Sequence, residues 1–113
     1  MYNARMVKMI ALYKRPADPA AFDKHYETVH KPLALKIPEL AEFRSSKVIG
    51  GPAGKSPWYF MVELCFKDKD SFKRGIMSPE SLAAAKDLDN FAKGACEVFF
   101  VEEQQTAPVP AGR

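Results

Sequence analysis

A nine-residue stretch restricts the fold of this chain more than any other, because it alternates like a β-strand and carries large apolar side chains on both sides. Its even positions are Trp58, Phe60, Val62, Leu64 and Phe66, and its odd positions are Tyr59, Met61, Glu63 and Cys65. Successive side chains of a strand point to opposite faces of a sheet. We expect the even side to pack on helices and the odd side to need a cover as well, since monomers rarely expose a large apolar patch.

A second strand is expected at Val7–Tyr13, and it too is mostly apolar on both sides. Two further strands are predicted at Glu39–Ile49 and at Cys96–Val101. The run Gly50–Pro57 has the glycine and proline content of a loop. The chain therefore supplies enough strands for a small sheet.

The first helix is expected to begin at Pro19. Asp18 can accept a hydrogen bond from an early helical N–H, and proline is favoured at the first position because its missing donor costs nothing there. At about 100° per residue, four apolar side chains fall on one stripe that should face the sheet: Phe22, Tyr26, Val29 and Leu33.

Both histidines of the chain lie on this helix. In a regular α-helix His25 and His30 would lie about 140° apart, on opposite shoulders of the stripe, which argues against one metal ion held by both. Pro32 removes the N–H that would bond to the carbonyl of Thr28, and it biases Lys31 away from helical dihedrals. The sequence therefore predicts a kink or an end of the helix between Thr28 and Lys31.

A second helical region follows the third strand in two pieces. Asp70–Ser71 can cap a short helix, and Ser78–Pro79 repeats the capped-proline signal for a longer helix that ends at Gly94. The order strand, helix, strand, strand, helix, strand is typical of an α+β ferredoxin-like βαββαβ sandwich, a four-stranded antiparallel sheet with both helices on one face. We expect a single domain over residues 1–103, a loose tail over residues 104–113, and a second copy of the chain over the open face.

Composition and charge argue against several classes of protein. A formal charge of +3 is too small and too scattered to indicate nucleic acid or an anionic membrane, and Trp58–Phe66 lacks the glycines and basic start of an RNA-recognition strand. No apolar run is long enough for a membrane span and Met1–Arg5 does not read as a signal sequence, so the cytoplasm is the expected compartment. Cys65 and Cys96 lack metal-binding spacing and are expected to be buried thiols.

His30 and Glu63 are the candidates for a catalytic role. His30 can act as a general acid or base or orient a ligand, since an imidazole titrates at about pH 6.5; it can equally be a structural donor to the carbonyls freed by Pro32. Glu63 can transfer a proton on the enclosed face of the sheet. Its alternatives are a cross-strand pair with a basic side chain such as Lys47 or Arg44, and an outer-edge position.

Four further side chains are candidates for contacts with a small apolar ligand: Tyr13, Tyr26, Tyr59 and Met61. They would line a pocket around the two catalytic candidates, although a plain core or dimer interface would explain them as well. No glycine-rich phosphate loop, hydrolase elbow or zinc spacing occurs in the sequence, so no cofactor and no metal is expected.

One pattern in the first third of the chain is carried by these residues: Lys8–Tyr13, Pro16, Asp18, Phe22, Tyr26, His30-x-Pro32-Leu33 and Pro38-x-Leu40. This pattern resembles that of the EthD family, named for ethyl tert-butyl ether degradation, and the resemblance covers about residues 6–103. Glu39 departs from the commonest pattern, which often has a glycine before the leucine.

The resemblance implies a place in the dimeric α/β-barrel superfamily, in which two ferredoxin-like protomers oppose their sheets and enclose a ligand cavity in each subunit. Superfamily relatives include cofactor-free monooxygenases, polyketide cyclases, muconolactone isomerases and haem-degrading enzymes, whereas EthD proteins mostly lack an assigned reaction. We expect a homodimeric, cofactor-independent enzyme of the isomerase, cyclase or monooxygenase type, or a ligand binder, acting on a small apolar metabolite in a catabolic pathway. The alternatives are a non-catalytic accessory dimer of a degradation pathway and a haem-binding protein with His30 as axial ligand.

Overall fold

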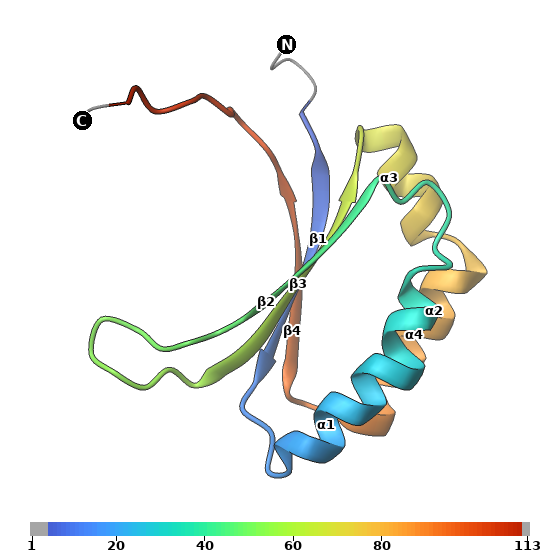
Figure 1. The fold of residues 1–113 in the computed structure, drawn as a ribbon. Coiled ribbons are helices and arrows are strands. Elements are labelled where there is room, and N and C mark those ends of the chain that lie inside the picture. The colour runs from blue at the N-terminus through green and yellow to red at the C-terminus, as the bar shows by residue number, and fades with distance from the viewer. Residues whose placement is uncertain (1–4, 112–113) are drawn as a thin grey trace.

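Four antiparallel strands form one sheet with the order β2-β3-β1-β4. The computed structural model describes residues 5–111. Its elements (Figure 1) are β1 Val7–Lys14, α1 Pro19–His25, η1 Tyr26–His30, α2 Lys31–Ala34, β2 Glu42–Lys47, β3 Trp58–Phe66, α3 Lys69–Ile76, α4 Pro79–Phe91 and β4 Cys96–Glu102. Both outer strands pair with a central strand on one side only.

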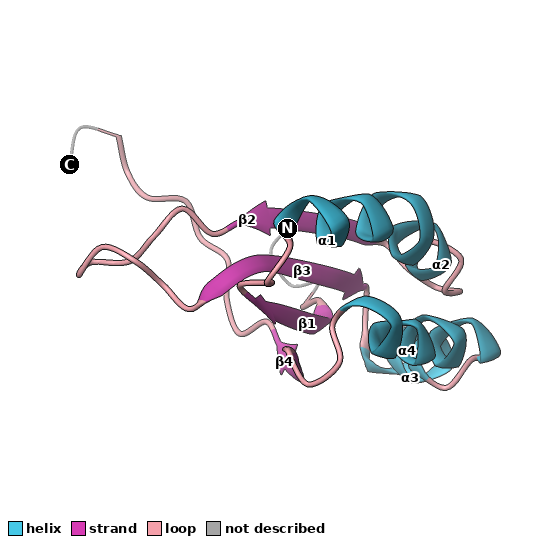
Figure 2. Cartoon of the chain, turned by 90° about the horizontal axis from the view of Figure 1, so that it is seen from below, coloured by secondary structure: helices cyan, strands magenta, loops and turns pink. Residues whose placement is uncertain are grey.

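All the helices lie on one face of this sheet. Figure 2 shows the α1–α2 segment beside the β2 edge and α4 beside the β4 edge. Met9 pairs with Leu64 and Ala11 with Val62 in the register of β1 and β3, and these side chains belong to the core under the helices. The predicted ferredoxin-like sandwich is confirmed, as is the packing of Phe60, Val62, Leu64 and Phe66 on helices. Trp58, the fifth even position, is not part of this core, because a register shift separates it from Phe60.

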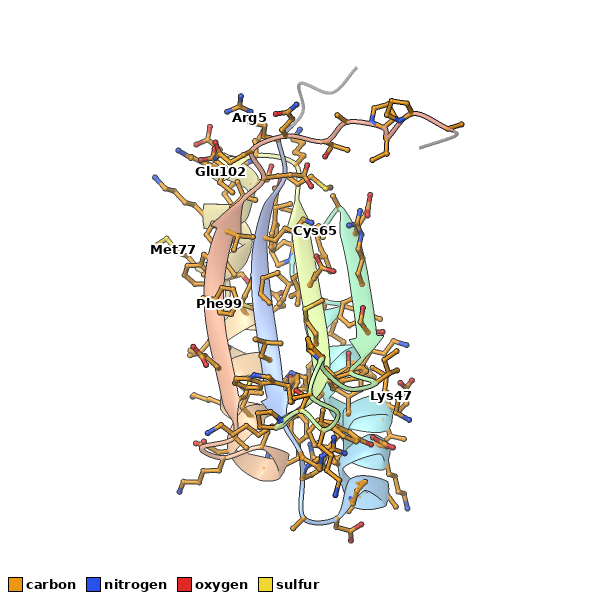
Figure 3. All side chains as sticks on the ribbon, turned by 90° about the vertical axis from the view of Figure 1, so that its left-hand side faces the viewer. Arg5, Lys47, Cys65, Met77, Phe99 and Glu102 are labelled. Atoms are coloured by element: carbon orange, nitrogen blue, oxygen red, sulfur yellow. The ribbon has the colours of Figure 1, made fainter. Side chains whose placement is uncertain are left out.

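No described helix covers the opposite face of the sheet, which Figure 3 shows from the front. Ile10 pairs with Phe99 and Leu12 with Met61, so apolar side chains continue across three neighbouring strands. Phe99 is 40% exposed. The β2–β3 loop and the C-terminal segment both leave the sheet on this same side (Figure 1). The open apolar face expected from the sequence is therefore present.

Three polar side chains set the helix starts. Asp18 and Ser78 each accept a hydrogen bond from the backbone N–H three residues on, at 3.1 Å, as predicted for α1 and α4. The start of α3 is earlier than the predicted Asp70–Ser71, because Asp68 is the residue that accepts from the Ser71 N–H, at 2.8 Å. Within residues 5–111, no helix has both the length and the apolar character that crossing a bilayer requires.

The second strand is shorter than predicted, because the chain turns sharply at Glu39 before β2 begins. Glu39 has a φ of 70°, in the left-handed region that favours glycine. Its carboxylate accepts hydrogen bonds from the Nε and Nη2 atoms of Arg74, at 3.2 and 3.3 Å. This pair holds the turn against α3 although the residue is not a glycine.

Candidate functional site

The first helix continues through Pro32, because its middle turn is wider than an α-helical turn. Tyr26–His30 form a π turn in which the N–H of Lys31 donates to the carbonyl of Tyr26, and α geometry resumes at Lys31–Ala34. The helix therefore does not end between Thr28 and Lys31, and Lys31 keeps helical dihedrals, with φ −58° and ψ −46°. The irregularity expected at this place is present as the π turn. In a regular α-helical turn, proline has no N–H to donate, and its ring clashes with the carbonyl four residues earlier. A widened turn tolerates the proline because it places that carbonyl elsewhere.

The π turn also shifts the buried side of the helix. Val29 was predicted to face the sheet, yet it is 40% exposed, whereas His30 and Ala34 are buried. One extra residue in a turn rotates everything that follows it by one position. His30 therefore takes the inward position that a regular helix would give to Val29.

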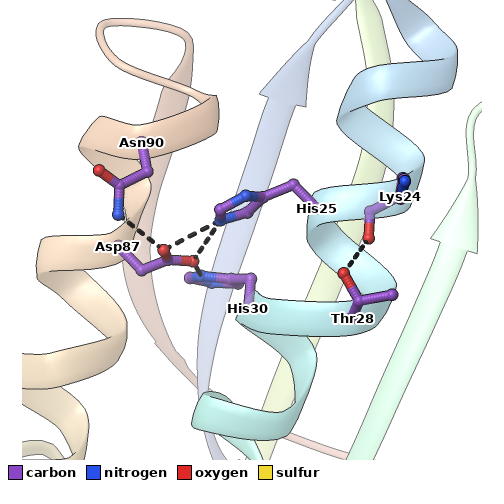
Figure 4. A network of polar contacts seen from close by, with 6 residues as sticks. All are labelled: Lys24, His25, Thr28, His30, Asp87 and Asn90. Atoms are coloured by element: carbon purple, nitrogen blue, oxygen red, sulfur yellow. Dashed lines mark hydrogen bonds and ion pairs between the residues drawn. The ribbon is translucent and has the colours of Figure 1, made fainter.

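His25 and His30 converge on one carboxylate, that of Asp87 on α4 (Figure 4). The Asp87 Oδ2 atom lies 2.9 Å from His30 Nδ1, and both carboxylate oxygens lie 3.0 Å from His25 Nε2. Asn90 Nδ2 donates to Oδ1 at 2.9 Å. The prediction that the two histidines lie on opposite shoulders is wrong, since a π turn brings positions five apart onto one side.

Asp87 is a buried carboxylate, 5% exposed, held in its charged form. Burial by itself would raise its pKa, but hydrogen bonds from Asn90, His25 and His30 together lower the pKa below its usual range. Burial also lowers the pKa of His30, and it outweighs the opposite effect of Asp87. His30 is therefore neutral at neutral pH. Its Nδ1 proton is donated to Asp87, which leaves the lone pair of Nε2 available.

His30 borders a cavity of about 670 Å³ between the sheet and the helices. The walls come from all four strands and from η1, α2 and α4, with Phe43, Val62, Leu88 and Phe100 among the lining side chains. No described lining residue is Asp, Glu, Lys or Arg. Clefts of this volume with apolar walls and a few polar groups are typical of small-molecule sites.

Tyr13 and Tyr26 line the same cavity as His30. The Tyr26 hydroxyl is buried, and no residue between 5 and 111 forms a hydrogen bond with it. Burial raises the pKa of both phenols, so both stay protonated. The ring centroids of Tyr26 and His30 are 6.1 Å apart. A buried hydroxyl without a partner costs about 1–3 kcal/mol, and this one belongs to a residue of the cavity wall.

Glu63 and Met61 lie on the other face of the sheet, away from this cavity. Glu63 Oε1 accepts a hydrogen bond from Lys8 Nζ at 3.2 Å, and Lys8 also lies 3.5 Å from Glu103. The sheet therefore separates Glu63 from His30, since the odd positions of β3 in this region point away from the helices. The cross-strand pair with a basic side chain that the sequence offered as an alternative is therefore present, with Lys8 of β1 in place of the examples Lys47 and Arg44.

Tyr59 is turned toward the helices by a β-bulge, although its odd position predicted the opposite face. The pairing of β3 with β1 skips this residue, so that Tyr59 is the extra residue of the bulge. Its hydroxyl donates to the carboxylate of Asp23, at 2.8 and 3.1 Å from the two oxygens. Tyr59 does not line the main cavity; it lines a second hollow of about 320 Å³, to which Tyr26 also contributes.

Asp87, Asn90 and His25 belong to the site without having been assigned to it from the sequence. Asp87 did carry a signal, because it lies three residues after Ala84 and four before Phe91, on the apolar side of its helix. An acid in such a position must find donors. That His25 and His30 share this carboxylate could not have been predicted without knowledge of the π turn between them.

The donor set suits a neutral organic molecule better than a metal ion or haem. Among residues 5–111, no three His, Cys, Asp or Glu side chains are arranged to hold a metal ion, and the Asp87 oxygens already accept hydrogen bonds. His30 Nε2 has the chemistry of an axial haem ligand. The described lining, however, offers no basic side chain to pair with the haem propionates.

Comparisons with known proteins agree on one family. The family model described as the EthD domain matches residues 14–95. An uncharacterised 11.0 kDa protein of Rhodococcus erythropolis, from the thcB–thcC intergenic region, is 35% identical over 103 residues, which are 91% of this chain and 100% of the relative. The crystal structure of an EthD family protein from Bacillus halodurans is 38% identical, with a TM-score of 0.83 over 88% of this chain and 99% of that chain.

Two more distant structures share the fold alone. A dimeric protein of unknown function with a ferredoxin-like fold, from Bacteroides fragilis, is 20% identical, with a TM-score of 0.61 over 90% of this chain and 99% of that chain. The hydroxynitrile lyase of Passiflora edulis is 17% identical, with a TM-score of 0.70 over 93% of this chain and 99% of that chain. The fold therefore occurs both in a dimer of unknown function and in an enzyme.

Proposed function

Because this chain belongs to the EthD domain family, we propose that it is a homodimeric, cofactor-independent enzyme that moves a proton on a small, apolar, carbonyl-bearing molecule. His30 is the base, Asp87 orients it, and Tyr26 donates a hydrogen bond to the carbonyl oxygen. One observation carries the proposal: Tyr26 and His30 line the same apolar cavity, and the buried Tyr26 hydroxyl has no hydrogen-bond partner among the described residues. The Tyr26 hydroxyl as donor and the His30 imidazole as acceptor are together complementary to a carbonyl group next to an acidic C–H.

Asp87 makes His30 a better base than an isolated buried imidazole would be. The hydrogen bond to Nδ1 fixes the tautomer that presents the Nε2 lone pair to the cavity. When Nε2 takes up a proton, the Asp87 carboxylate stabilises the imidazolium that forms. The bonds from His25 and Asn90 hold the carboxylate in place for both tasks.

The proposed proton transfer needs no oxidant and no second substrate. Nε2 of His30 takes the proton from the carbon beside the carbonyl. The electron pair of that C–H bond forms a C=C bond, and the carbonyl π electrons move onto oxygen to give an enolate. Tyr26 donates to that oxygen in a water-poor cavity, where such a bond stabilises developing charge strongly. Return of the proton to another atom of the molecule gives an isomer.

The homodimer follows from the open face of the sheet. The apolar side chains on that face, Ile10, Leu12, Met61 and Phe99 among them, would be covered by the same face of a second copy. The β2–β3 loop and the C-terminal segment extend on that side, where a second copy would contact them. The dimeric state of the structural neighbour from Bacteroides fragilis supports this arrangement.

The non-catalytic alternatives differ in what they require of the cavity. An accessory dimer whose second face serves only assembly needs no ligand space, and a cavity of about 670 Å³ counts against it. A ligand binder would use Tyr26 and His30 to hold its ligand without moving a proton. The test must therefore separate binding from proton transfer.

Hydrogen–deuterium exchange at the carbon beside a carbonyl makes that separation. Acetophenone and methyl octyl ketone are incubated with the protein in D2O, and deuterium uptake is followed by mass spectrometry. We expect the protein to accelerate uptake, His30→Gln to lose about 100-fold to 10,000-fold of that rate, and Tyr26→Phe to lose about 100-fold. Tyr59→Phe removes a phenol hydroxyl outside the cavity and should leave the rate unchanged. Ketone binding without deuterium uptake would overturn the enzyme and leave a binder.

A further inference from the structure

We propose that the cavity takes an uncharged, elongated molecule that places one oxygen-bearing head at Tyr26 and His30 and extends an apolar body to an opening beside Met77, Leu82 and Phe100. The chemistry of the head rests on the proposed function. The charge and the length of the ligand are argued from the cavity itself.

The opening is marked by cavity-lining side chains that are also exposed. Met77 is 83% exposed, Leu82 57%, Phe100 57% and Val98, further along β4, 41%, yet all four line the cavity. They come from the α3–α4 junction, from α4 and from the edge strand β4. The cavity therefore opens between that edge of the sheet and the start of α4, through a mouth of mostly apolar side chains that also includes Ser78 and Ser81. Exposed apolar surface of this kind is typical of a ligand entrance.

Tyr26 and His30 lie at the opposite end of the cavity from this mouth. Along β1, Met9 pairs with Phe100 at the mouth, whereas Tyr13 lies 6.3 Å from Tyr26, centroid to centroid. Met9 and Tyr13 are four residues apart on a strand, a distance of about 13 Å. That length matches a chain of roughly ten bonded carbon atoms. The head of a bound molecule would be buried while its far end reaches the mouth.

The lining favours a molecule without charge. Asp87 lies directly behind His30, with 2.9 Å between Oδ2 and Nδ1, so a carboxylate or phosphate head at His30 would face a negative charge across one ring. No described lining side chain is a lysine or arginine that could pair with such a head, and none is an acid that could pair with a cation. A charged head would lose its hydration without compensation.

Isothermal titration calorimetry with matched probes tests this assignment. Decanol and methyl octyl ketone are the uncharged probes, and decanoate and decylammonium are charged probes of the same length. We expect the charged pair to bind at least about tenfold more weakly. Among straight-chain alcohols, affinity should rise about fourfold per methylene group, the gain from burying each one, and level off near ten carbons.

Two substitutions locate the bound chain. Ala11 lines the cavity midway along β1, so Ala11→Leu should weaken decanol binding while sparing butanol. Ala83→Leu is its matched control, since Ala83 is exposed and outside the lining. Leu82→Ser acts at the exposed mouth, where a folding defect is not expected, and it should also weaken decanol binding while sparing butanol.

The inference and the proposed function fail in different ways. Decanoate binding as tight as that of decanol, affinity independent of chain length, or equal effects of Ala11→Leu and Ala83→Leu would each overturn the ligand class. Length-dependent binding of the uncharged probes without deuterium uptake would keep the ligand class and overturn catalysis. Deuterium uptake by acetophenone, together with alcohol binding that does not depend on chain length, would keep catalysis and overturn the ligand class.

Discussion

His25 and His30 hold the same carboxylate group, although five positions separate them in the sequence. Their ring nitrogens lie 3.0 and 2.9 Å from oxygens of Asp87. Only a turn wider than an α-helical one brings such positions to one side of a helix, and η1 is that turn. The site therefore depends on local helix geometry as much as on the identity of its residues, and it ties the first helix to α4.

Asp87→Asn tests how much this carboxylate contributes to stability. An asparagine has one acceptor oxygen where the carboxylate has two, and its NH2 group would face the donors of His25, His30 and Asn90. We expect the free energy of unfolding to fall by about 1–3 kcal/mol, as for a buried donor left without its partner. Urea denaturation measures this. Asp89→Asn, on the exposed side of the same helix, should change stability by less than about 0.5 kcal/mol; a loss as large as that of Asp87→Asn would contradict the role of the cluster.

The pH dependence of stability tests the buried state of His30. Burial lowers its folded-state pKa below the usual 6.5, so in the window just below pH 6.5 the unfolded chain takes up a proton that the folded chain does not. The free energy of unfolding should therefore be full above pH 6.5 and fall as the pH drops through the folded-state pKa. The lowered pKa of Asp87 acts in the same direction, but only below its usual 3.8.

Urea denaturation between pH 7 and pH 5 gives the measurement for His30. His30→Gln removes the titrating group and should flatten the slope in this range, even if the variant is less stable overall. An unchanged slope in His30→Gln would show that another group is responsible. The same lowered pKa predicts that deuterium exchange by the wild-type protein persists below pH 6.5 and declines only as His30 becomes protonated.

The architecture could be predicted because its signals are local and repeated. The alternation of Trp58–Phe66 identified the central strand, and the capped prolines at Pro19 and Pro79 fixed two helix starts. Those features depend on neighbouring residues alone. Apolar side chains on both sides of the sheet then predicted an open face that the structure contains.

The site could be predicted only in part, because two backbone irregularities change the direction in which its candidate side chains point. A single extra residue in η1 turned His30 inward, and a single extra residue in β3 turned Tyr59 to the helix side. Neither event changes composition or periodicity enough to be seen in one sequence. Glu63 was grouped with His30 for another reason: the cavity that His30 borders lies on the helix-covered face, while the sequence suggested the face between two copies of the chain.

Phe99→Arg tests the assembly. Phe99 lies on the open sheet face and is 40% exposed, so a charge there would be buried unpaired against a second copy. We expect the variant to shift from dimer to monomer at micromolar concentration in native mass spectrometry. Leu35→Arg is the control, since Leu35 is 50% exposed on the helical side, and it should stay dimeric. Dissociation by Leu35→Arg alone would place the interface on the helices.

Tyr26→Phe tests whether the unpartnered hydroxyl is kept for a ligand. In the empty protein this substitution removes a buried polar group without breaking a hydrogen bond to any residue between 5 and 111, so we expect a gain of about 1–3 kcal/mol in the free energy of unfolding. The same change should weaken binding of methyl octyl ketone, because the carbonyl loses its donor.

Tyr59→Phe offers the opposite pair of outcomes. Its hydroxyl donates to Asp23 at 2.8 Å, so its loss should destabilise the protein by about 1 kcal/mol and leave ketone binding unchanged. If Tyr26→Phe destabilised the protein as Tyr59→Phe does, the hydroxyl would have a structural partner, and the main support for a carbonyl ligand would be gone. Stability gained together with affinity lost is the signature of a group retained for function at the expense of the fold.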